Sequence, residues 1–207
     1  MTRRVVVTGL GLVTPVGLNV KDSWDNILAG KSGITPITHF DVSEFSVRFS
    51  GSIRDFDITD YIPKKDARRM DTFIHYGIAA GTQALKDSGL EVTDANAHRI
   101  GVSIGSGIGG LSSIEKGHDA YLKGGPRKIS PFFVPSSIIN MISGNFSIMH
   151  GLKGPNIADV TACTTGTHSV GDAGRMIAHG DADVMISGGA DIATSPMGPG
   201  CFCAALG

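Results

Sequence analysis

Apolar residues recur along the chain in short continuous runs and in longer stretches with a helical repeat. The short runs predict buried strands at residues 3–8, 99–105, 157–161 and 183–187. One run in which apolar and polar residues alternate predicts an edge strand at residues 47–53. The helical repeat predicts helices at residues 20–29, 64–88, 111–122, 136–149 and 163–179. Strands that alternate with helices indicate an α/β fold with a largely parallel sheet.

The signals at the ends of these stretches sharpen the prediction. Pro63 precedes the longest helical stretch and Gly89 follows it, as expected for a helix start and a helix end. Residues 130–135 (SPFFVP) indicate a proline-bracketed loop. After residue 187 we expect only a short loop, without a further helix or strand. Residues 1–207 therefore form one domain or one half of a larger fold.

Composition narrows the class of protein. Of 207 residues, 41% are hydrophobic and 18% charged, which indicates a globular chain, and the 29 glycines are typical of tightly packed α/β folds. The net charge of −1 gives no general attraction to nucleic acid. No window approaches the ~18 apolar residues of a membrane span, and no signal peptide is recognisable. We expect a soluble, cytoplasmic protein without membrane contact.

The three cysteines are Cys163, Cys201 and Cys203. An odd number without a signal peptide argues against a disulfide framework, and Cys201 and Cys203 lack the further ligands of a zinc site. We expect neither a metal nor a cofactor.

Cys163 has the most informative surroundings. It lies in the stretch DVTACTTG, where a predicted strand turns sharply and the cysteine opens the predicted helix 163–179. The free amides of a helix start favour a thiolate and can stabilise an oxyanion at a thioester carbonyl, so Cys163 is a candidate nucleophile. The alternative is a buried structural thiol. No histidine lies in a recognisable catalytic motif, and His168, five residues on, is turned away from Cys163 on an ideal helix.

Two further features have alternative interpretations. Residues 105–110 (GSGIGG) formally match a dinucleotide-binding fingerprint, but no acidic residue follows at the expected distance, which favours a turn that approaches another group closely. Basic residues form two clusters, which are a solvated face or a docking site for an acidic partner. These residues are Lys64, Lys65, Arg68 and Arg69, and then Arg127 and Lys128.

The order of several motifs is similar to that of the β-ketoacyl-acyl-carrier-protein synthases, and within this family to synthase II of bacterial fatty acid synthesis. The matching stretches are VVVTGLG (5–11), GSGIGG (105–110), PRKISPFFVP (126–135), TACTTG (161–166), and GDAD (180–183) with GGA (188–190). The resemblance covers essentially the whole chain.

The resemblance implies a thiolase-like αβαβα sandwich of two related halves, of which residues 1–207 form the N-terminal half, incomplete without the other, and a homodimer. It implies a Claisen condensation in which Cys163 accepts an acyl group from acyl carrier protein and malonyl-carrier protein then loses carbon dioxide. It makes the two basic clusters the carrier-protein docking site. It also implies an acyl pocket lined by Gly107, Ile108, Phe133, Ile138 and Phe202, in part across the dimer interface. The family's two catalytic histidines and its lysine have no counterpart in this sequence.

Two other functions are open. The chain could be a non-catalytic fragment or scaffold that binds carrier protein without turnover, although the presence of Cys163 favours an enzyme. It could also be a polyketide-type ketosynthase. The sequence Thr164-Thr165-Gly166 favours the fatty acid type over the serine-rich sequence common in polyketide enzymes.

Overall fold

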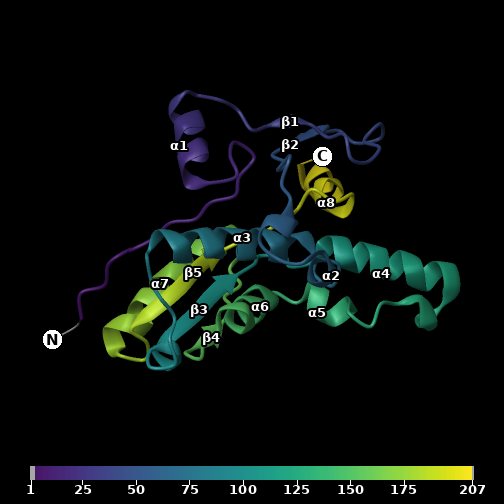
Figure 1. The fold of residues 1–207 in the computed structure, drawn as a ribbon. Coiled ribbons are helices and arrows are strands. Elements are labelled where there is room, and N and C mark those ends of the chain that lie inside the picture. Colours follow the sequence, from purple (N-terminus) through teal and green to yellow (C-terminus); the bar gives the residue numbers. More distant parts are fainter. Residues whose placement is uncertain (1–2, 207) are drawn as a thin grey trace.

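The computed structural model describes residues 3–206, with the backbone alone for residue 206. Its centre is a three-stranded parallel sheet in the order β4 (Asn156–Ile157), β3 (Ile100–Gly105) and β5 (Val184–Gly189) (Figure 1). Val102 of β3 is in register with Asn156 on one side and Ile186 on the other. The predicted α/β fold with a parallel sheet is confirmed. β4 is shorter than the predicted strand 157–161.

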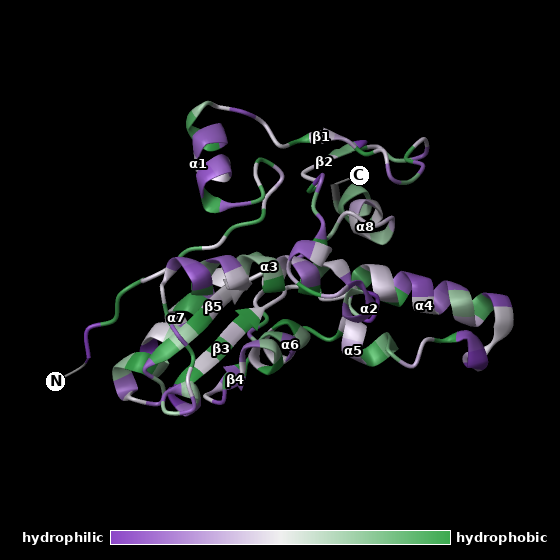
Figure 2. Cartoon of the chain, in the orientation of Figure 1, coloured by the Kyte–Doolittle hydropathy of each residue, from purple (hydrophilic) through white to green (hydrophobic). Residues whose placement is uncertain are grey.

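The hydrophobic core lies between this sheet and two helices, α3 (Thr72–Asp87) and α6 (Met141–His150). Every residue of β3 is buried, and its alternate residues Ile100, Val102 and Ile104 belong to the core cluster. The residues between them, Gly101, Ser103 and Gly105, point to the opposite face because side chains alternate along a strand. There Gly105 packs against Thr165 of helix α7 (Thr165–His179). Figure 2 shows the concentration of hydrophobic residues in β3 and β5.

The predicted helix 64–88 is wrong as a single element. It is divided into α2 (Lys64–Ala67) and α3, with a break at residues 68–71. Asp71 has extended backbone, with ψ of 161°, and its side chain is buried. The Asp71 carboxylate accepts a hydrogen bond of 2.7 Å from the Ser113 N–H in helix α4 (Leu111–Gly124). A contact between distant segments thus breaks a helix that the local pattern alone would continue.

The predicted helix 136–149 is also divided, into α5 (Phe133–Ser137) and α6. Helix α5 takes up part of the expected loop 130–135, and Ile138 is extended between the two helices. Helix α1 (Val20–Leu28) is confirmed, with the Asn19 side chain accepting from the Asp22 N–H at 2.8 Å. Its apolar residues Trp24, Ile27 and Leu28 are exposed.

The predicted strand at residues 3–8 is wrong. This segment is assigned to no strand, and Val5, Val6 and Val7 are exposed. A strand needs a hydrogen-bonded neighbouring strand. The segment that follows packs instead against the end of α3, where the Leu10 N–H donates to the Asp87 carboxylate at 2.9 Å. Arg3 instead binds Asp183, which also binds Arg99. Hydrogen bonds from these two arginines lower the pKa of the Asp183 carboxyl to about 2.

The remaining elements surround this centre. β1 (Thr35–Pro36) and β2 (Phe49–Ser50) form a two-residue antiparallel pair, so the predicted edge strand 47–53 is reduced to its middle. Helix α8 (Met197–Leu206) contradicts the expected short loop after residue 187. Single 3-10 turns lie at Ile58–Asp60, Ala97–Arg99, Pro126–Lys128 and Ala162–Thr164. None of the helices within residues 3–206 combines the length and the apolar character needed to cross a bilayer.

Candidate functional site

Cys163 lies in a tight turn between the end of the sheet and helix α7. The turn is the 3-10 element Ala162–Thr164, and α7 begins at Thr165. The cysteine therefore precedes the α-helix by two residues, which corrects the prediction that it opens it. Cys163 is exposed, which contradicts the alternative of a buried structural thiol. Ala162 has a φ of +52°, a strained conformation for a residue other than glycine.

Side-chain hydrogen bonds hold this strained turn. The Thr165 hydroxyl accepts from the Thr161 N–H at 2.9 Å and donates to the Ala162 carbonyl at 2.8 Å. The Thr164 hydroxyl donates to the Thr161 carbonyl at 2.6 Å, and Nδ1 of His168 lies 2.6 Å from the Thr161 hydroxyl. These four side chains fix the backbone on both sides of Cys163, so the sulfur is presented at a defined point just before the start of α7.

The glycine run 105–110 lies directly beside this turn. A Cβ on Gly107 would come within 3.1 Å of the Ala162 carbonyl oxygen. The Gly107 N–H donates to Asp191 at 2.8 Å, and the Gly109 N–H donates to the Ser106 hydroxyl at 2.9 Å. These amides are used within the protein, so they are not free to hold a pyrophosphate. The interpretation as a close-approach turn is favoured over dinucleotide binding.

The residues expected to line an acyl pocket are not all brought together. Gly107 and the exposed Ile108 lie next to the cysteine turn, but Phe133 packs on Gly117 of α4. Ile138 and Phe202 are both exposed. Phe133 lines a cavity together with basic residues, and that cavity does not include Cys163.

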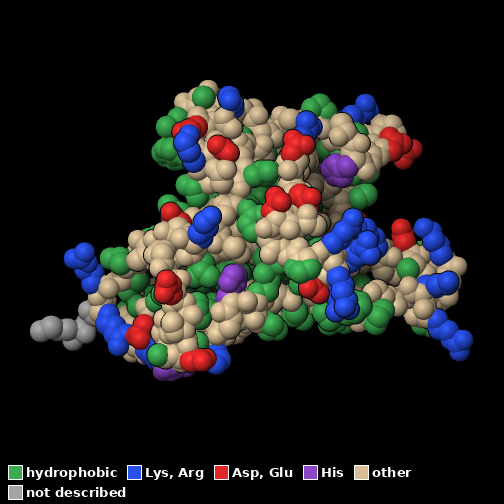
Figure 3. All heavy atoms as spheres, in the orientation of Figure 1, with side chains coloured by type: hydrophobic (Ala, Val, Ile, Leu, Met, Phe, Trp, Pro, Cys, Tyr) green, Lys and Arg blue, Asp and Glu red, His purple; other side chains and the backbone are tan. Residues whose placement is uncertain are grey.

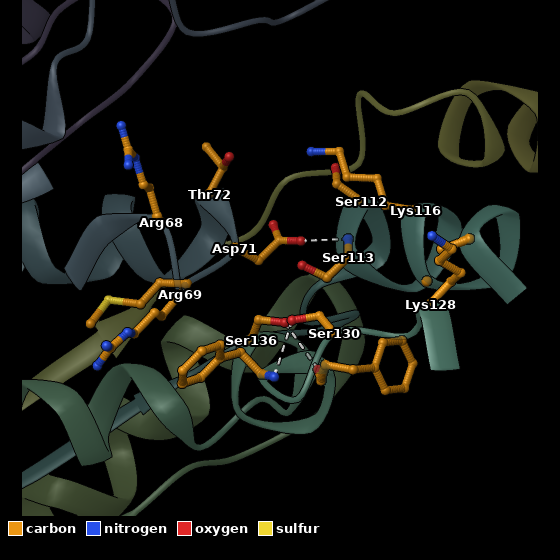
Figure 4. A pocket seen from close by; sticks show the side chains of 15 residues that line it. Arg68, Arg69, Asp71, Thr72, Ser112, Ser113, Lys116, Lys128, Ser130 and Ser136 are labelled. Atoms are coloured by element: carbon orange, nitrogen blue, oxygen red, sulfur yellow. Dashed lines mark hydrogen bonds between the residues drawn. The ribbon is translucent and has the colours of Figure 1, made fainter. Parts of the chain in front are cut away.

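The two basic clusters meet in this cavity, which has a volume of about 270 Å³ (Figure 4). It lies between the α2–α3 break and α4, and it joins Arg68 and Arg69 of the first cluster to Lys128 of the second. The guanidinium of Arg69 stacks over the Phe132 ring at 4.8 Å. Lys64, Lys65 and Arg127 are exposed outside it. Figure 3 shows Lys and Arg side chains gathered over α2.

Lys116 on α4 also lines this cavity, although no pattern in the sequence had singled it out. It lies 47 residues after Arg69 of the first cluster and 11 residues before Arg127 of the second. The hydrogen bond from Ser113 to Asp71 fixes the start of α4 beside the α2–α3 break, and the turn Pro126–Lys128 packs against α4. No group of His, Cys, Asp or Glu within residues 3–206 is arranged to hold a metal ion.

A parallel sheet covered by helices, with an exposed cysteine in a strained turn just before a helix, is the arrangement expected of the N-terminal half of a thiolase-like fold. The comparisons agree. The chain belongs to the β-ketoacyl synthase family, because the model of its N-terminal domain matches residues 2–206. Relatives called 3-oxoacyl-[acyl-carrier-protein] synthase 2 are 63% identical in Vibrio harveyi and 55% identical in Coxiella burnetii, each over 98% of this chain.

Solved structures have the same fold. A β-ketoacyl synthase from Burkholderia phymatum is 26% identical with a TM-score of 0.85, over 99% of this chain and 50% of that one. A type II polyketide ketosynthase in complex with its acyl-carrier protein is 26% identical with a TM-score of 0.79, over 95% of this chain and 53% of that one. The chain spans 49% of the length of the two curated relatives.

Proposed function

We propose that this chain supplies the nucleophile and the carrier-protein docking surface of a fatty acid condensing enzyme, a β-ketoacyl-acyl-carrier-protein synthase that acts in the cytoplasm. The observation that carries the proposal is the exposed Cys163 in its strained, hydrogen-bonded turn. Relatives 48–64% identical to this chain are named for this activity, which supports the same assignment.

In the first step, the Cys163 sulfur attacks the carbonyl carbon of an acyl thioester on the carrier protein. The new carbon–sulfur bond forms as the carrier's bond breaks, and the carrier thiol takes the proton that leaves Cys163. In the second step, malonyl thioester loses carbon dioxide. The electron pair left on its α-carbon attacks the Cys163 thioester, and the thiolate of Cys163 leaves. The product is a β-ketoacyl thioester two carbons longer.

The second step develops negative charge on a thioester oxygen, which needs aimed hydrogen-bond donors. The family resemblance assigns this role to two histidines, which, like the family's catalytic lysine, have no counterpart among these 207 residues. The one histidine close to the turn, His168, is hydrogen-bonded to Thr161. These residues therefore account for acylation of Cys163, and condensation requires the remaining donors.

The positive charge around the basic cavity is complementary to an acidic carrier protein. Arg68, Lys116 and Lys128 line it, and none of them has an ion-pair partner among the described residues. Unpaired cations of this kind steer an acidic partner and fix its orientation. The docking surface consists of these residues and the neighbouring basic side chains Lys64, Lys65, Arg69 and Arg127.

A homodimer would cover a second, apolar cavity of about 590 Å³ next to the basic one. Tyr61, Met70, Met141 and Met149 line it, and the side chain of Ile148 at its rim is 79% exposed. An apolar surface of this kind is favourable to bury against another chain. The family resemblance implies that some of the residues Phe133, Ile138 and Phe202 then reach the acyl pocket across the dimer interface.

The test uses the purified gene product and acyl- and malonyl-carrier protein. Intact mass after incubation with the acyl donor alone should show one acyl group on Cys163, and adding malonyl-carrier protein should yield β-ketoacyl product. Cys163→Ala should abolish both. Acylation without any condensation in the gene product would instead favour a carrier-binding scaffold. A product extended repeatedly without reduction would favour a polyketide-type ketosynthase.

A further inference from the structure

The Asp191 carboxylate holds the glycine turn that lies beside Cys163. Asp191 follows the end of β5 by two residues. Its Oδ2 accepts from the Gly107 N–H at 2.8 Å, and its Oδ1 accepts from the Ser106 hydroxyl at 3.1 Å. The Ser106 oxygen accepts in turn from the Gly109 N–H at 2.9 Å. One carboxylate thus fixes residues 106–109 from both ends of the turn.

These contacts act although Asp191 itself is exposed. Its oxygens point towards the interior, where Ser106 is only 1% exposed. Hydrogen bonds to a charged acceptor are stronger than those between neutral groups, and the glycines have little conformational preference of their own to hold the turn. The position of the turn therefore depends on the carboxylate more than on local sequence.

The turn is confined between Asp191 and the cysteine turn. A Cβ at Gly107 would lie 2.8 Å from the Asp191 Oδ2 and 3.1 Å from the Ala162 carbonyl oxygen. The backbone at Gly107 therefore touches the residue that precedes the nucleophile. Ile108 follows at the tip of the turn, with its side chain 44% exposed. Any shift of Asp191 displaces Ile108 relative to Cys163.

The segment that carries Asp191 is anchored a second time. Glu115 on α4 accepts from the Ser195 hydroxyl at 3.0 Å and from the Met197 N–H at 2.6 Å. Residues 191–197 are thus hydrogen-bonded to the glycine turn at one end and to helix α4 at the other. We therefore expect the segment to keep its place when Asp191 is replaced, so that only the glycine turn is released.

We propose that Asp191 is a positioning residue that determines which acyl chains reach Cys163, because it fixes the Gly107–Ile108 turn against the nucleophile turn. The inference rests on the proposed function, in which Cys163 accepts the acyl group, and on the expectation from the family resemblance that Ile108 lines the acyl pocket. Asp191 does not touch the acyl group. It acts through the two donors, Gly107 N–H and the Ser106 hydroxyl.

The experiment compares Asp191→Ala with Asp191→Asn in the purified gene product. Asparagine retains an oxygen for the Gly107 N–H, whereas alanine leaves this donor unpaired. The rate of Cys163 acylation is measured by intact mass with hexanoyl- and palmitoyl-carrier protein. In Asp191→Ala the ratio of the two kcat/KM values should change by about tenfold, a factor within reach of one lost hydrogen bond to a charged group. Asp191→Asn should stay close to the wild type. Asp94→Ala, which removes an exposed carboxylate elsewhere, is the matched control.

Hydrogen exchange provides a second measurement that needs no activity. The amides of Gly107 and Gly109 should lose protection in Asp191→Ala and keep it in Asp191→Asn. Lost protection with an unchanged ratio would reduce Asp191 to a structural brace, and unchanged protection would mean that Asp191 does not hold the turn. If Asp191→Ala does not fold, Ser106→Ala removes one of the donors and should move both readouts in the same direction. If Cys163 of the wild type is never acylated, the proposed function is wrong, and hydrogen exchange still decides whether Asp191 holds the turn.

Discussion

The three cysteines provide a test at the scale of single residues. Cys163 and Cys201 are exposed, whereas Cys203 is half-buried. Hydrogen bonds from the Ser46 side chain and the Val47 backbone lower the pKa of the Cys203 thiol, so Cys203 is the main competitor for an alkylating reagent. Reactivity alone does not identify the nucleophile, but protection by substrate does.

We expect iodoacetamide at neutral pH to label Cys163 before the other two cysteines. Prior incubation with acyl-carrier protein should protect Cys163 alone, because only this sulfur forms the thioester. Peptide mapping by mass spectrometry measures all three sites together. Equal labelling of the three cysteines, or equal protection of them, would show that Cys163 has no privileged role.

Lys116 provides a test of the docking cavity. Lys116→Glu should raise the KM for acyl-carrier protein, by roughly fivefold for one reversed contact of about 1 kcal/mol, and by more at low salt. Small thioesters that lack the carrier protein should react as before. Lys31→Glu reverses an exposed charge in a loop away from the cavity and serves as the control. If carrier-bound and small substrates suffer alike, the effect of Lys116 is structural.

The contact between α3 and α6 determines how two buried helices meet. A Cβ on Gly77 of α3 would overlap the side chain of Ile142 on α6, and both residues are buried. Overpacking of this kind costs about 1–3 kcal/mol, more than the up to ~1 kcal/mol that alanine gains in helix propensity. We therefore expect Gly77→Ala to lower the urea midpoint of unfolding.

Gly171 on α7 is the matched control, because no atom lies within 4 Å of a Cβ there. Gly171→Ala should leave stability unchanged or raise it by up to ~1 kcal/mol. Combined with Ile142→Ala, the additional cost of Gly77→Ala should disappear. A Gly77→Ala variant as stable as the wild type would contradict the close α3–α6 contact.

His150, the last residue of α6, gives stability a pH dependence. Its ring packs against Phe146 at 4.3 Å between centroids, its Nε2 is buried without a hydrogen-bond partner, and burial lowers its pKa below 6.5. Burial lowers the pKa of His75 as well. The unfolded chain binds a proton at these histidines more readily than the folded protein does. The free energy of unfolding is therefore highest at pH values above the pKa of these histidines in the unfolded chain, and it decreases as the pH falls below that pKa.

The urea midpoint should therefore fall between about pH 7.5 and about pH 5. His150→Phe should reduce this slope, since phenylalanine cannot bind a proton. The slope that His75 contributes should persist in this variant. An unchanged slope would mean that His150 is already solvated in the folded protein.

At the scale of the whole molecule, several apolar groups of residues 3–205 face solvent. Val5, Val6 and Val7 are exposed near the N-terminus, as are Val170 on α7 and Phe202 on α8. Exposed apolar surface beyond a few hundred Å² is uncommon in soluble monomers. We expect residues 1–207, produced alone, to self-associate or to bind a hydrophobic dye, as measured by light scattering and fluorescence.

The same preparation should form no β-ketoacyl product. Addition of the C-terminal half of the Vibrio harveyi relative should restore turnover, and Cys163→Ala should abolish it again. A monodisperse monomer that condenses by itself in a Cys163-dependent way would contradict the assignment of the remaining chemistry to that half.

The sequence by itself determined the parts of this protein that depend on local pattern. The apolar run at residues 99–105 predicted the buried strand β3, and the helical repeat at residues 20–29 predicted α1, because both follow from residue type and spacing. The motif around Cys163 identified the candidate nucleophile, because a helix start favours a thiolate and the stretch TACTTG is similar to the nucleophile motif of the family. The two basic clusters were likewise recognisable as runs of charge.

Only the tertiary structure decided the features that depend on contacts between distant residues. The break between α2 and α3 depends on Asp71 reaching Ser113, and the lack of a strand at Val5–Val7 depends on the absence of a hydrogen-bonded neighbour for these residues. Lys116 joins the basic cavity because α4 packs beside both the α2–α3 break and the turn Pro126–Lys128. Asp191 reaches a turn 84 residues earlier in the chain, a contact that no local pattern encodes. Periodicity reports which face of an element is apolar, whereas the partner of that face is chosen only when the chain folds.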